Sequence, residues 1–332
     1  MLRVAINGFG RIGRIALRLL QDDKDVQVVA INNRTPGNEQ LAYLYKYDSS
    51  HRTLKAKVDY DDEGIIVKGK KIKVFAIEDP SKLPWGKLKI DVVLECTGAF
   101  TSKEACQAHI NAGAKHVIIS APAKDDAKTI VYGVNHKSLS KKDKIISAAS
   151  CTTNCLAPVL KVLDDKFHIV KGYMTTVHAM TNDQETLDIA HKKGIYSRRG
   201  RAASLNIIPT STGAASQIGK VIPHLNGKMD GNAFRVPVGD GSVVDVTLEL
   251  EKNVTKEEIN KAFFNNQSKT LRYSSEPLVS SDIIGEQCGG MVDGLLTNVI
   301  ESDGKQLVKV VAWYDNEVGY TAQMIRTMKL FI

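Results

Sequence analysis

The first thirteen residues constrain the fold of this chain more than any other segment. An apolar, strand-like run over residues 3–7 leads directly into Gly8-Phe9-Gly10-Arg11-Ile12-Gly13, and amphipathic spacing predicts a helix over residues 11–21. Glycines with this spacing allow a tight turn and close approach of the backbone to a ligand. The free N–H groups at the start of such a helix bind pyrophosphate. We therefore predict a dinucleotide-binding unit that uses Gly8, Gly10 and Gly13; a glycine turn that only packs helix on strand is the alternative.

Strand-like and helix-like segments alternate through the first third of the chain. After the first pair, strands are predicted at residues 26–32, 65–67, 71–76, 92–96 and 116–120, and helices at 40–47 and 102–112. Strands that alternate with helices form a parallel sheet. This part of the chain is therefore predicted to be α/β, with a Rossmann-type, doubly wound parallel sheet.

The pattern changes after Cys151. Longer segments with alternating character predict strands at residues 172–178, 235–238, 242–250 and 307–314, and a Thr-x-x-Glu pattern opens a predicted helix at 255–265. Apolar residues at helical spacing predict a terminal helix from about Glu317. A length of 332 residues suggests about two domains, so a second domain with a mixed or antiparallel sheet is expected.

Composition excludes several classes of protein. With 43% hydrophobic and 25% charged residues, the chain is typical of a soluble globular protein, and it has no apolar run of about 18 residues that could span a membrane. The N-terminal apolar stretch ends too early for a signal peptide. Five cysteines, an odd number, indicate free thiols in a reducing compartment. We expect a cytoplasmic protein without membrane contact.

A basic segment stands out against a net charge of +8. Residues 191–201 hold five Lys and Arg and no acid, and Thr210-Ser211-Thr212-Gly213 and Arg235 follow. Hydroxyls, glycine backbone and arginines together suit a phosphate monoester. RNA is the competing ligand, but the segment has one aromatic residue, Tyr196, and no RNA-binding signature. We do not expect nucleic acid to be the primary partner.

A cysteine and a histidine are the candidate reactive groups. Cys151 lies between a strand-like segment and a predicted helix, where the helix start stabilises a thiolate. His178 ends a β-branched strand and precedes a polar turn, which makes it the best candidate for a base. Cys155 lies one turn after Cys151, but no second CxxC or paired histidine completes a metal site, so no metal is expected. Together with the glycine loop, these residues predict a thiol-dependent dehydrogenase.

Motifs along the whole chain resemble phosphorylating glyceraldehyde-3-phosphate dehydrogenases of the bacterial type. In order they are AINGFGRIGR (5–14), ECTG (95–98), ASCTTNC (149–155), IPTSTGAA (208–215) and WYDNE (313–317). The resemblance implies a homotetramer that acts in glycolysis and gluconeogenesis. It also implies an NAD(P)-binding Rossmann domain of residues 1–150 with the C-terminal helix 317–332, and a catalytic domain of residues 151–316.

The resemblance also implies a reaction. The Cys151 thiolate would attack the aldehyde of glyceraldehyde 3-phosphate, the thiohemiacetal would give a hydride to nicotinamide, and inorganic phosphate would cleave the thioester. His178 would take and return the proton and, with the backbone N–H of Cys151, stabilise the oxyanion. The implied ligands of the substrate phosphate are Thr181, Asp183, Arg199 and Arg235, and those of the attacking phosphate are Ser150, Thr152, Thr212 and Gly213. The implied cofactor residues are Gly8, Gly10, Arg11, Ile12, Gly13, Thr97, Gly98, Phe100, Ser120, Asn316 and Tyr320.

Departures from the family pattern concern the choice of cofactor. Asn33-Arg34 stands at the end of the second strand, where NAD-type members carry an Asp that would repel a 2′-phosphate. Arg34 could attract that phosphate, or Asn33 could bind the ribose of NAD while Arg34 faces solvent. Ala190 replaces the proline of a Leu-Pro pair, as in enzymes that accept NADP, whereas Glu78 stands where an arginine is common. The loop from Lys193 to Ser197 looks longer than usual. We expect use of both NAD and NADP.

Two other functions compete with this interpretation. Erythrose-4-phosphate dehydrogenase shares the cysteine and the histidine, but the intact set for the attacking phosphate favours the phosphorylating enzyme. A nucleic-acid-binding or surface-binding protein on the same fold would use the basic segment instead. A kinetic requirement for phosphate separates the first alternative, and salt-sensitive RNA binding by an inactive protein would support the second.

Overall fold

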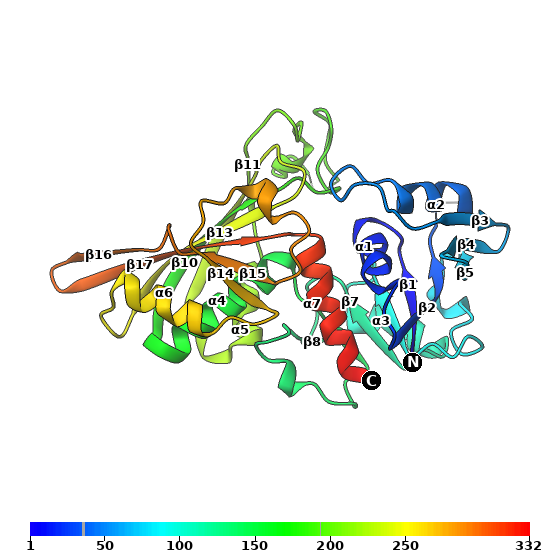
Figure 1. The fold of residues 1–332 in the computed structure, drawn as a ribbon, viewed down its shortest axis with the longest axis horizontal. Coiled ribbons are helices and arrows are strands. Elements are labelled where there is room, and N and C mark those ends of the chain that lie inside the picture. The colour runs from blue at the N-terminus through cyan, green and yellow to red at the C-terminus, as the bar shows by residue number, and fades with distance from the viewer. Residues whose placement is uncertain (35–36, 193) are drawn as a thin grey trace. The chain divides into compact units, whose positions relative to one another are not determined.

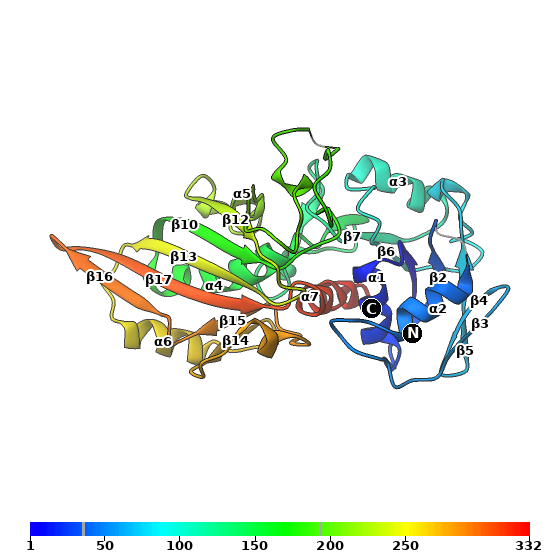
Figure 2. The same ribbon diagram turned by 90° about the horizontal axis from the view of Figure 1, so that it is seen from above.

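A computed structural model describes residues 1–34, 37–192 and 194–332. Contacts divide the chain into two compact units. The first unit comprises Met1–Ile130, His136–Ala149 and Met324–Ile332, and the second comprises Val131–Asn135 and Ser150–Gln323. Figures 1 and 2 label their elements. Lys193, the first residue of the loop expected to be long, lies outside the described residues.

The first unit is built on one sheet with the strand order β3-β4-β5-β2-β1-β6-β7-β9-β8. The run from β5 through β2, β1, β6, β7 and β9 is parallel, whereas β3 and β4 are antiparallel additions at one edge. The strands are β1 (Leu2–Asn7), β2 (Val26–Asn32), β3 (Val58–Asp61), β4 (Gly64–Val67), β5 (Lys70–Phe75), β6 (Val92–Glu95), β7 (His116–Ile119), β8 (Lys128–Thr129) and β9 (Ile145–Ser147). The helices are α1 (Arg11–Leu20), α2 (Asn38–Lys46) and α3 (Lys103–Asn111), with short 3-10 turns at Pro80–Lys82 and His136–Ser138. This order confirms the predicted Rossmann-type sheet, in which ligands bind where the order reverses, between β1 and β6.

Close backbone contacts explain the glycine loop after β1. Gly8 has φ +93, and a Cβ atom there would lie 2.7 Å from the backbone N of Thr97. A Cβ on Gly13 would lie 2.2 Å from the Gly8 carbonyl oxygen, so a larger residue would force α1 away from the loop. Packing therefore requires glycine at both positions, independently of any bound ligand.

The second unit is built on a mixed sheet with the order β11-β12-β10-β13-β17-β15-β14, with β16 paired to β17. The pairs β10/β12 and β14/β15 are parallel and the other pairs are antiparallel, which confirms the predicted mixed sheet. The strands are β10 (Ile169–His178), β11 (Ile208–Ser211), β12 (Met229–Arg235), β13 (Ser242–Leu250), β14 (Leu271–Ser274), β15 (Gly290–Asp293), β16 (Asn298–Ser302) and β17 (Lys305–Tyr314). Helix α4 (Cys151–Phe167) packs on this sheet, and α5 (Ala214–Val221) and α6 (Lys256–Asn265) pack against α4 (Figure 1). Short 3-10 turns lie at Arg198–Gly200, Pro223–Leu225 and Ser280–Ile283.

The last helix, α7 (Val318–Met328), is followed by a 3-10 turn at Lys329–Phe331. Its residues up to Gln323 cluster with the second unit, and Met324–Ile332 clusters with the first. The ring of Phe331 stacks on His116 with centroids 4.0 Å apart, and Lys329 forms an ion pair with Asp23. The end of the chain is therefore held in the first unit.

One predicted strand was placed wrongly. The strand expected at residues 235–238 is β12, which ends at Arg235 and begins at Met229. Its sequence, MDGNAFR, is poor in β-branched residues, so local propensity does not reveal it. Pairing with β10 on one side and β11 on the other holds it in the sheet.

No helix within the described residues is both long and apolar enough to cross a bilayer.

Candidate active site

The start of helix α4 presents Cys151. Ser150 is the N-cap residue, and its hydroxyl accepts a hydrogen bond from the backbone N–H of Thr153 at 3.1 Å. Burial raises the pKa of the Cys151 thiol, and this effect outweighs the lowering by the charge of Arg235 and by the backbone N–H groups of Thr152 and Cys151. The predicted stabilisation of a thiolate by the helix start stays a prediction, and burial of the sulfur opposes it.

His178 is the candidate base for the Cys151 thiol. It is the last residue of β10, and its Nε2 atom lies 3.3 Å from Cys151 Sγ. Its Nδ1 atom lies 2.7 Å from the carbonyl oxygen of Ala179, which can only accept, and 3.0 Å from Arg235 Nη1, which can only donate. Burial, together with the charges of Arg235 and Arg199, lowers the pKa of His178 to about 3. The imidazole is therefore neutral at physiological pH and able to accept the thiol proton.

The buried, neutral His178 predicts a loss of stability in acid. The unfolded chain binds a proton at His178 as pH falls through 6.5, whereas the native imidazole does so only near 3. The unfolded state is therefore favoured progressively below pH 6.5, by about 2 kcal/mol between pH 7 and pH 5. Urea denaturation at pH 7 and at pH 5 measures this effect. The free energy of unfolding of His178→Asn should fall by about 2 kcal/mol less between these two pH values than that of wild type. An unchanged pH dependence would contradict the assignment of a neutral His178.

Four residues expected around the substrate phosphate form one connected cluster. Arg235 lies opposite His178 in the pairing of β12 with β10, and its Nη1 atom donates to Thr181 Oγ1 at 2.9 Å. Thr181 donates to Asp183, which also forms a very short ion pair with Arg199. The cluster holds two guanidinium groups and one carboxylate, so it has an excess of positive charge suited to an anion.

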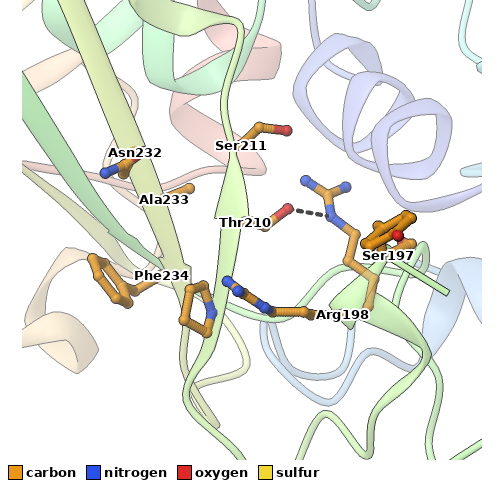
Figure 3. Close-up of a pocket in the computed structure, with 10 residues that line it drawn as sticks. Ser197, Arg198, Thr210, Ser211, Asn232, Ala233 and Phe234 are labelled. Carbon is orange, nitrogen blue, oxygen red and sulfur yellow. Dashed lines mark hydrogen bonds between the residues drawn. The ribbon is translucent and has the colours of Figure 1, made fainter.

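Thr210 completes this cluster and was not predicted as a ligand on its own. Its hydroxyl accepts a hydrogen bond from Arg199 Nε at 3.2 Å, the dashed line in Figure 3. A cavity of 640 Å³ opens beside it; its walls are Tyr196, Ser197, Arg198, Arg199, Pro209, Thr210, Ser211, Asn232, Ala233 and Phe234. Cys151 and His178 are not among the residues that line this cavity.

Thr152 takes part in a hydrogen-bond chain with a residue that the sequence analysis missed, Tyr314. The hydroxyl of Thr176 donates to the Val243 carbonyl at 3.1 Å, so Tyr314, 2.8 Å away, donates to Thr176. The single hydroxyl hydrogen of Tyr314 is used in this bond. Thr152, whose Oγ1 lies 2.9 Å from the Tyr314 hydroxyl, therefore donates to Tyr314. The Thr152 hydroxyl therefore presents only lone pairs to any other group. Tyr314 lies within the WYDNE motif, but its hydroxyl contacts depend on pairing between distant strands.

The other residues expected at the attacking phosphate have local roles. Thr212 Oγ1 accepts a hydrogen bond from the N–H of Ala214 at 3.2 Å, and Gly213 is the N-cap residue of α5. Among the residues described, no hydrogen bond connects either of them with Cys151.

The first unit contains a cavity of 380 Å³ at the glycine loop. It is lined by Asn7, Gly8, Gly10, Asn32, Asn33, Arg34, Ile77, Glu78, Cys96, Thr97, Ala99 and Phe100. Arg11, Ile12, Gly13, Gly98 and Ser120, which were also expected at the cofactor, are not among these lining residues. Arg11 instead forms an ion pair with Asp48, with 2.5 Å between Nη1 and Oδ2.

The residues that bear on cofactor choice have defined partners. The side-chain oxygen of Asn33 accepts a hydrogen bond from the Phe9 N–H at 3.0 Å, so Asn33 holds the glycine loop. Arg34 lies 3.6 Å from Glu78, and the two side chains are 78% and 83% exposed. Ala190 is exposed in the second unit.

Asn316 and Tyr320, the last two expected cofactor residues, are buried in the second unit. Ser242 donates to the side-chain oxygen of Asn316 at 2.7 Å and accepts from the Ala179 N–H. Asn316 is thereby connected to the residue that follows His178.

Two family models match the chain. One, described as glyceraldehyde 3-phosphate dehydrogenase, NAD binding domain, matches residues 2–103, and the other, described as glyceraldehyde 3-phosphate dehydrogenase, C-terminal domain, matches residues 150–316. The chain belongs to the glyceraldehyde-3-phosphate dehydrogenase family. The resemblance inferred from the sequence motifs is confirmed.

Curated relatives carry the same family name over their full length. The glyceraldehyde-3-phosphate dehydrogenases of Clostridium pasteurianum and Clostridium acetobutylicum are 55% and 54% identical over 331 residues. That of Streptococcus pyogenes is 49% identical over 332 residues. Each match covers 100% of this chain and 98% of the relative. These names favour the main interpretation over the two alternatives.

Proposed function

We propose that this chain catalyses the reversible oxidative phosphorylation of glyceraldehyde 3-phosphate to 1,3-bisphosphoglycerate with reduction of NAD. The observation that carries this proposal is the contact of 3.3 Å between Cys151 Sγ and Nε2 of His178, a buried imidazole with a lowered pKa, beside the cationic cluster of Arg235 and Arg199. A nucleophile, its base and an anion site are what a phosphorylated aldehyde requires.

His178 controls the proton throughout the proposed reaction. Nε2 accepts the proton of Cys151, and the thiolate attacks the aldehyde carbon to form a thiohemiacetal. The backbone N–H of Cys151 and protonated His178 stabilise the oxygen that becomes negative. His178 then holds the hydroxyl proton of the thiohemiacetal as the thioester forms. Bound nicotinamide supplies the hydride acceptor for this oxidation.

Inorganic phosphate is the proposed second substrate. Its oxygen attacks the thioester carbon, and Cys151 leaves as a thiolate that recovers its proton from His178. Ser150, Thr152, Thr212 and Gly213 are the proposed binding residues. Because the Thr152 proton is committed to Tyr314, Thr152 would accept a hydrogen bond from the protonated oxygen of hydrogen phosphate. The substrate phosphate would be bound by Thr181, Asp183, Arg199 and Arg235.

The proposed cofactor site suits a dinucleotide. At Gly8 and Gly13 a Cβ atom would collide with backbone atoms, so the chain passes closely through the glycine loop. A cavity of 380 Å³ lies beside this loop. Residues 1–150 with helix 317–332 are the proposed NAD(P)-binding domain, and 151–316 the catalytic domain. We propose that Gly8, Gly10, Asn33, Thr97 and Phe100 bind the cofactor within the cavity, with Asn316 and Tyr320 at the nicotinamide.

Initial rates test the function directly. Purified protein is assayed with glyceraldehyde 3-phosphate, with and without inorganic phosphate, and with NAD or NADP at matched concentrations. Phosphate-dependent reduction is the expected result. Phosphate-independent oxidation with a preference for erythrose 4-phosphate would support the first alternative. An inactive protein with strong, salt-sensitive RNA binding would support the second.

NADP is the proposed second cofactor, and Glu78 is expected to limit its use. A 2′-phosphate would have to compete with Glu78 for Arg34. In Glu78→Gln we expect kcat/KM for NADP to rise by about threefold, as for the loss of one exposed ion pair, while the value for NAD changes less. Glu257→Gln, at an exposed carboxylate on α6, is the charge-matched control. Equal increases for both cofactors would contradict a role of Arg34 in selecting NADP.

A homotetramer in the cytoplasm is the proposed state of the protein. The described part of the basic segment presents exposed apolar side chains, including Ile195 at 90% and Tyr196 at 94%, which would be covered by another subunit. Within the described residues the five cysteines form no disulfide, which supports a reducing compartment. Light scattering after size-exclusion chromatography gives the subunit number.

A further inference from the structure

A buried carboxylate lies beneath the cavity of the first unit. Glu95 ends β6 and is 1% exposed. Its Oε1 atom accepts hydrogen bonds from the N–H of Thr97 at 2.8 Å and from the Thr97 hydroxyl. Its Oε2 atom accepts from Asn7 Nδ2 at 2.5 Å and lies 3.1 Å from His109 Nε2. A buried charge is costly without such partners, so this site is built to hold an ionised carboxylate.

Trp85 determines the protonation state of His109. The indole N–H can only donate, and it lies 3.0 Å from His109 Nδ1, which must therefore be unprotonated. The neutral ring then carries its proton on Nε2 and donates it to Glu95. His109 and Trp85 are both 0% exposed, so water does not replace these bonds.

The network continues to the ends of neighbouring strands. The side-chain oxygen of Asn7, at the end of β1, accepts from Asn32 Nδ2 at 2.7 Å. Asn32, at the end of β2, accepts from the N–H of Ile77 at 2.9 Å and donates to the Ile77 carbonyl at 2.9 Å. One carboxylate thus anchors the ends of β1, β2 and β6 and the segment after β5.

The residues held by this network line the cavity, whereas Glu95, His109 and Trp85 do not. Asn7, Asn32, Ile77 and Thr97 are all lining residues. The backbone of Thr97 also packs against Gly8, where a Cβ atom would lie 2.7 Å from the Thr97 N, so a shift of Thr97 would disturb the glycine loop. We propose that Glu95 is a positioning residue for dinucleotide binding, kept in orientation by His109 and Trp85. This proposal rests on the proposed cofactor function of the first unit.

Glu95→Gln is the sharpest test of the network. Glutamine has the same size, but its Nε2 must replace one of the two carboxylate oxygens. In one orientation this donor faces Asn7 Nδ2 and His109 Nε2–H, and in the other it faces both donors of Thr97. In either arrangement two hydrogen-bond donors face each other. A hydrogen bond to Asn7 or Thr97, which both line the cavity, must therefore break.

Calorimetric titration with NAD and steady-state kinetics measure the effect. For Glu95→Gln we expect the dissociation constant of NAD and its KM to rise at least tenfold. The kcat at saturating NAD and the KM for inorganic phosphate should stay within about twofold of wild type. His109→Leu, which removes one donor to Glu95 and also lies outside the cavity, should raise the dissociation constant by at least threefold and serves if Glu95→Gln does not fold.

Val117→Ala separates positioning from general loss of stability. Val117 is fully buried on β7, next to β6, and contributes only packing. Val117→Ala should lower the melting temperature, while its dissociation constant for NAD stays within about twofold of wild type. Folded Glu95→Gln or His109→Leu protein that binds NAD as tightly as wild type would overturn the proposal alone. Wild-type protein that binds neither NAD nor NADP would instead overturn the cofactor function and, with it, this proposal.

Discussion

Replacing Cys151 with serine is expected to reduce turnover of glyceraldehyde 3-phosphate by about a thousandfold or more. A serine hydroxyl is not ionised by a neutral imidazole at 3.3 Å, and it is a much weaker nucleophile than a thiolate. NAD should still bind, because the cavity at the glycine loop contains no atom of Cys151. Stopped-flow measurement of the first turnover and calorimetric titration with NAD test the two parts separately.

Cys155→Ser is the matched control for this prediction. Cys155 lies one helical turn after Cys151 and is completely buried, and burial raises its pKa well above the ordinary value. Its sulfur lies close to the carbonyl oxygens of Ala312 and Trp313 and not to His178. This variant should keep most of its activity. Substantial turnover by Cys151→Ser would show that another group is the nucleophile.

Replacing His178 with asparagine is expected to lower kcat by about a hundredfold to ten-thousandfold, the usual range for loss of a general base. Without the imidazole, the thiol must ionise unaided, and burial raises the pKa of Cys151. The residual rate should therefore increase as pH rises, whereas the wild-type rate should be less sensitive to pH over the same interval. A variant with wild-type kcat would contradict the assigned base.

Alkylation by iodoacetamide provides a second readout for His178→Asn. Burial raises the pKa of both Cys96 and Cys106 to about 12, so these thiols should react slowly at neutral pH. Mass spectrometry can follow modification of Cys151, which should be slower in His178→Asn than in wild type. His136→Asn, at a histidine of the first unit, controls for loss of a histidine and should leave the rate unchanged.

The parts of the site that could be predicted from the sequence are those set by local chain geometry. A glycine loop between a strand and a helix, Cys151 at a helix start and His178 at a strand end are each recognised from a few neighbouring residues. The structure has β1, α1, α4 and β10 in these positions. The motifs also identified the family, since their order along the chain is specific.

Strand β12 shows where local reasoning ends. The strand that carries Arg235 was misplaced, because its residues have low strand propensity and long-range pairing holds it in the sheet. That same pairing brings Arg235 beside His178, where it meets Thr181.

The sequence by itself determined the fold class and the family and predicted the reactive groups, because each depends on short-range spacing. Only the tertiary structure decided their chemical state. Burial raises the pKa of Cys151 and lowers that of His178, and burial depends on every element packed around the site. The direction of the hydrogen bonds at Tyr314, and those that hold Glu95, depends on which donors and acceptors distant strands bring together. These properties have no local signal, since they arise from contacts between residues far apart in the chain.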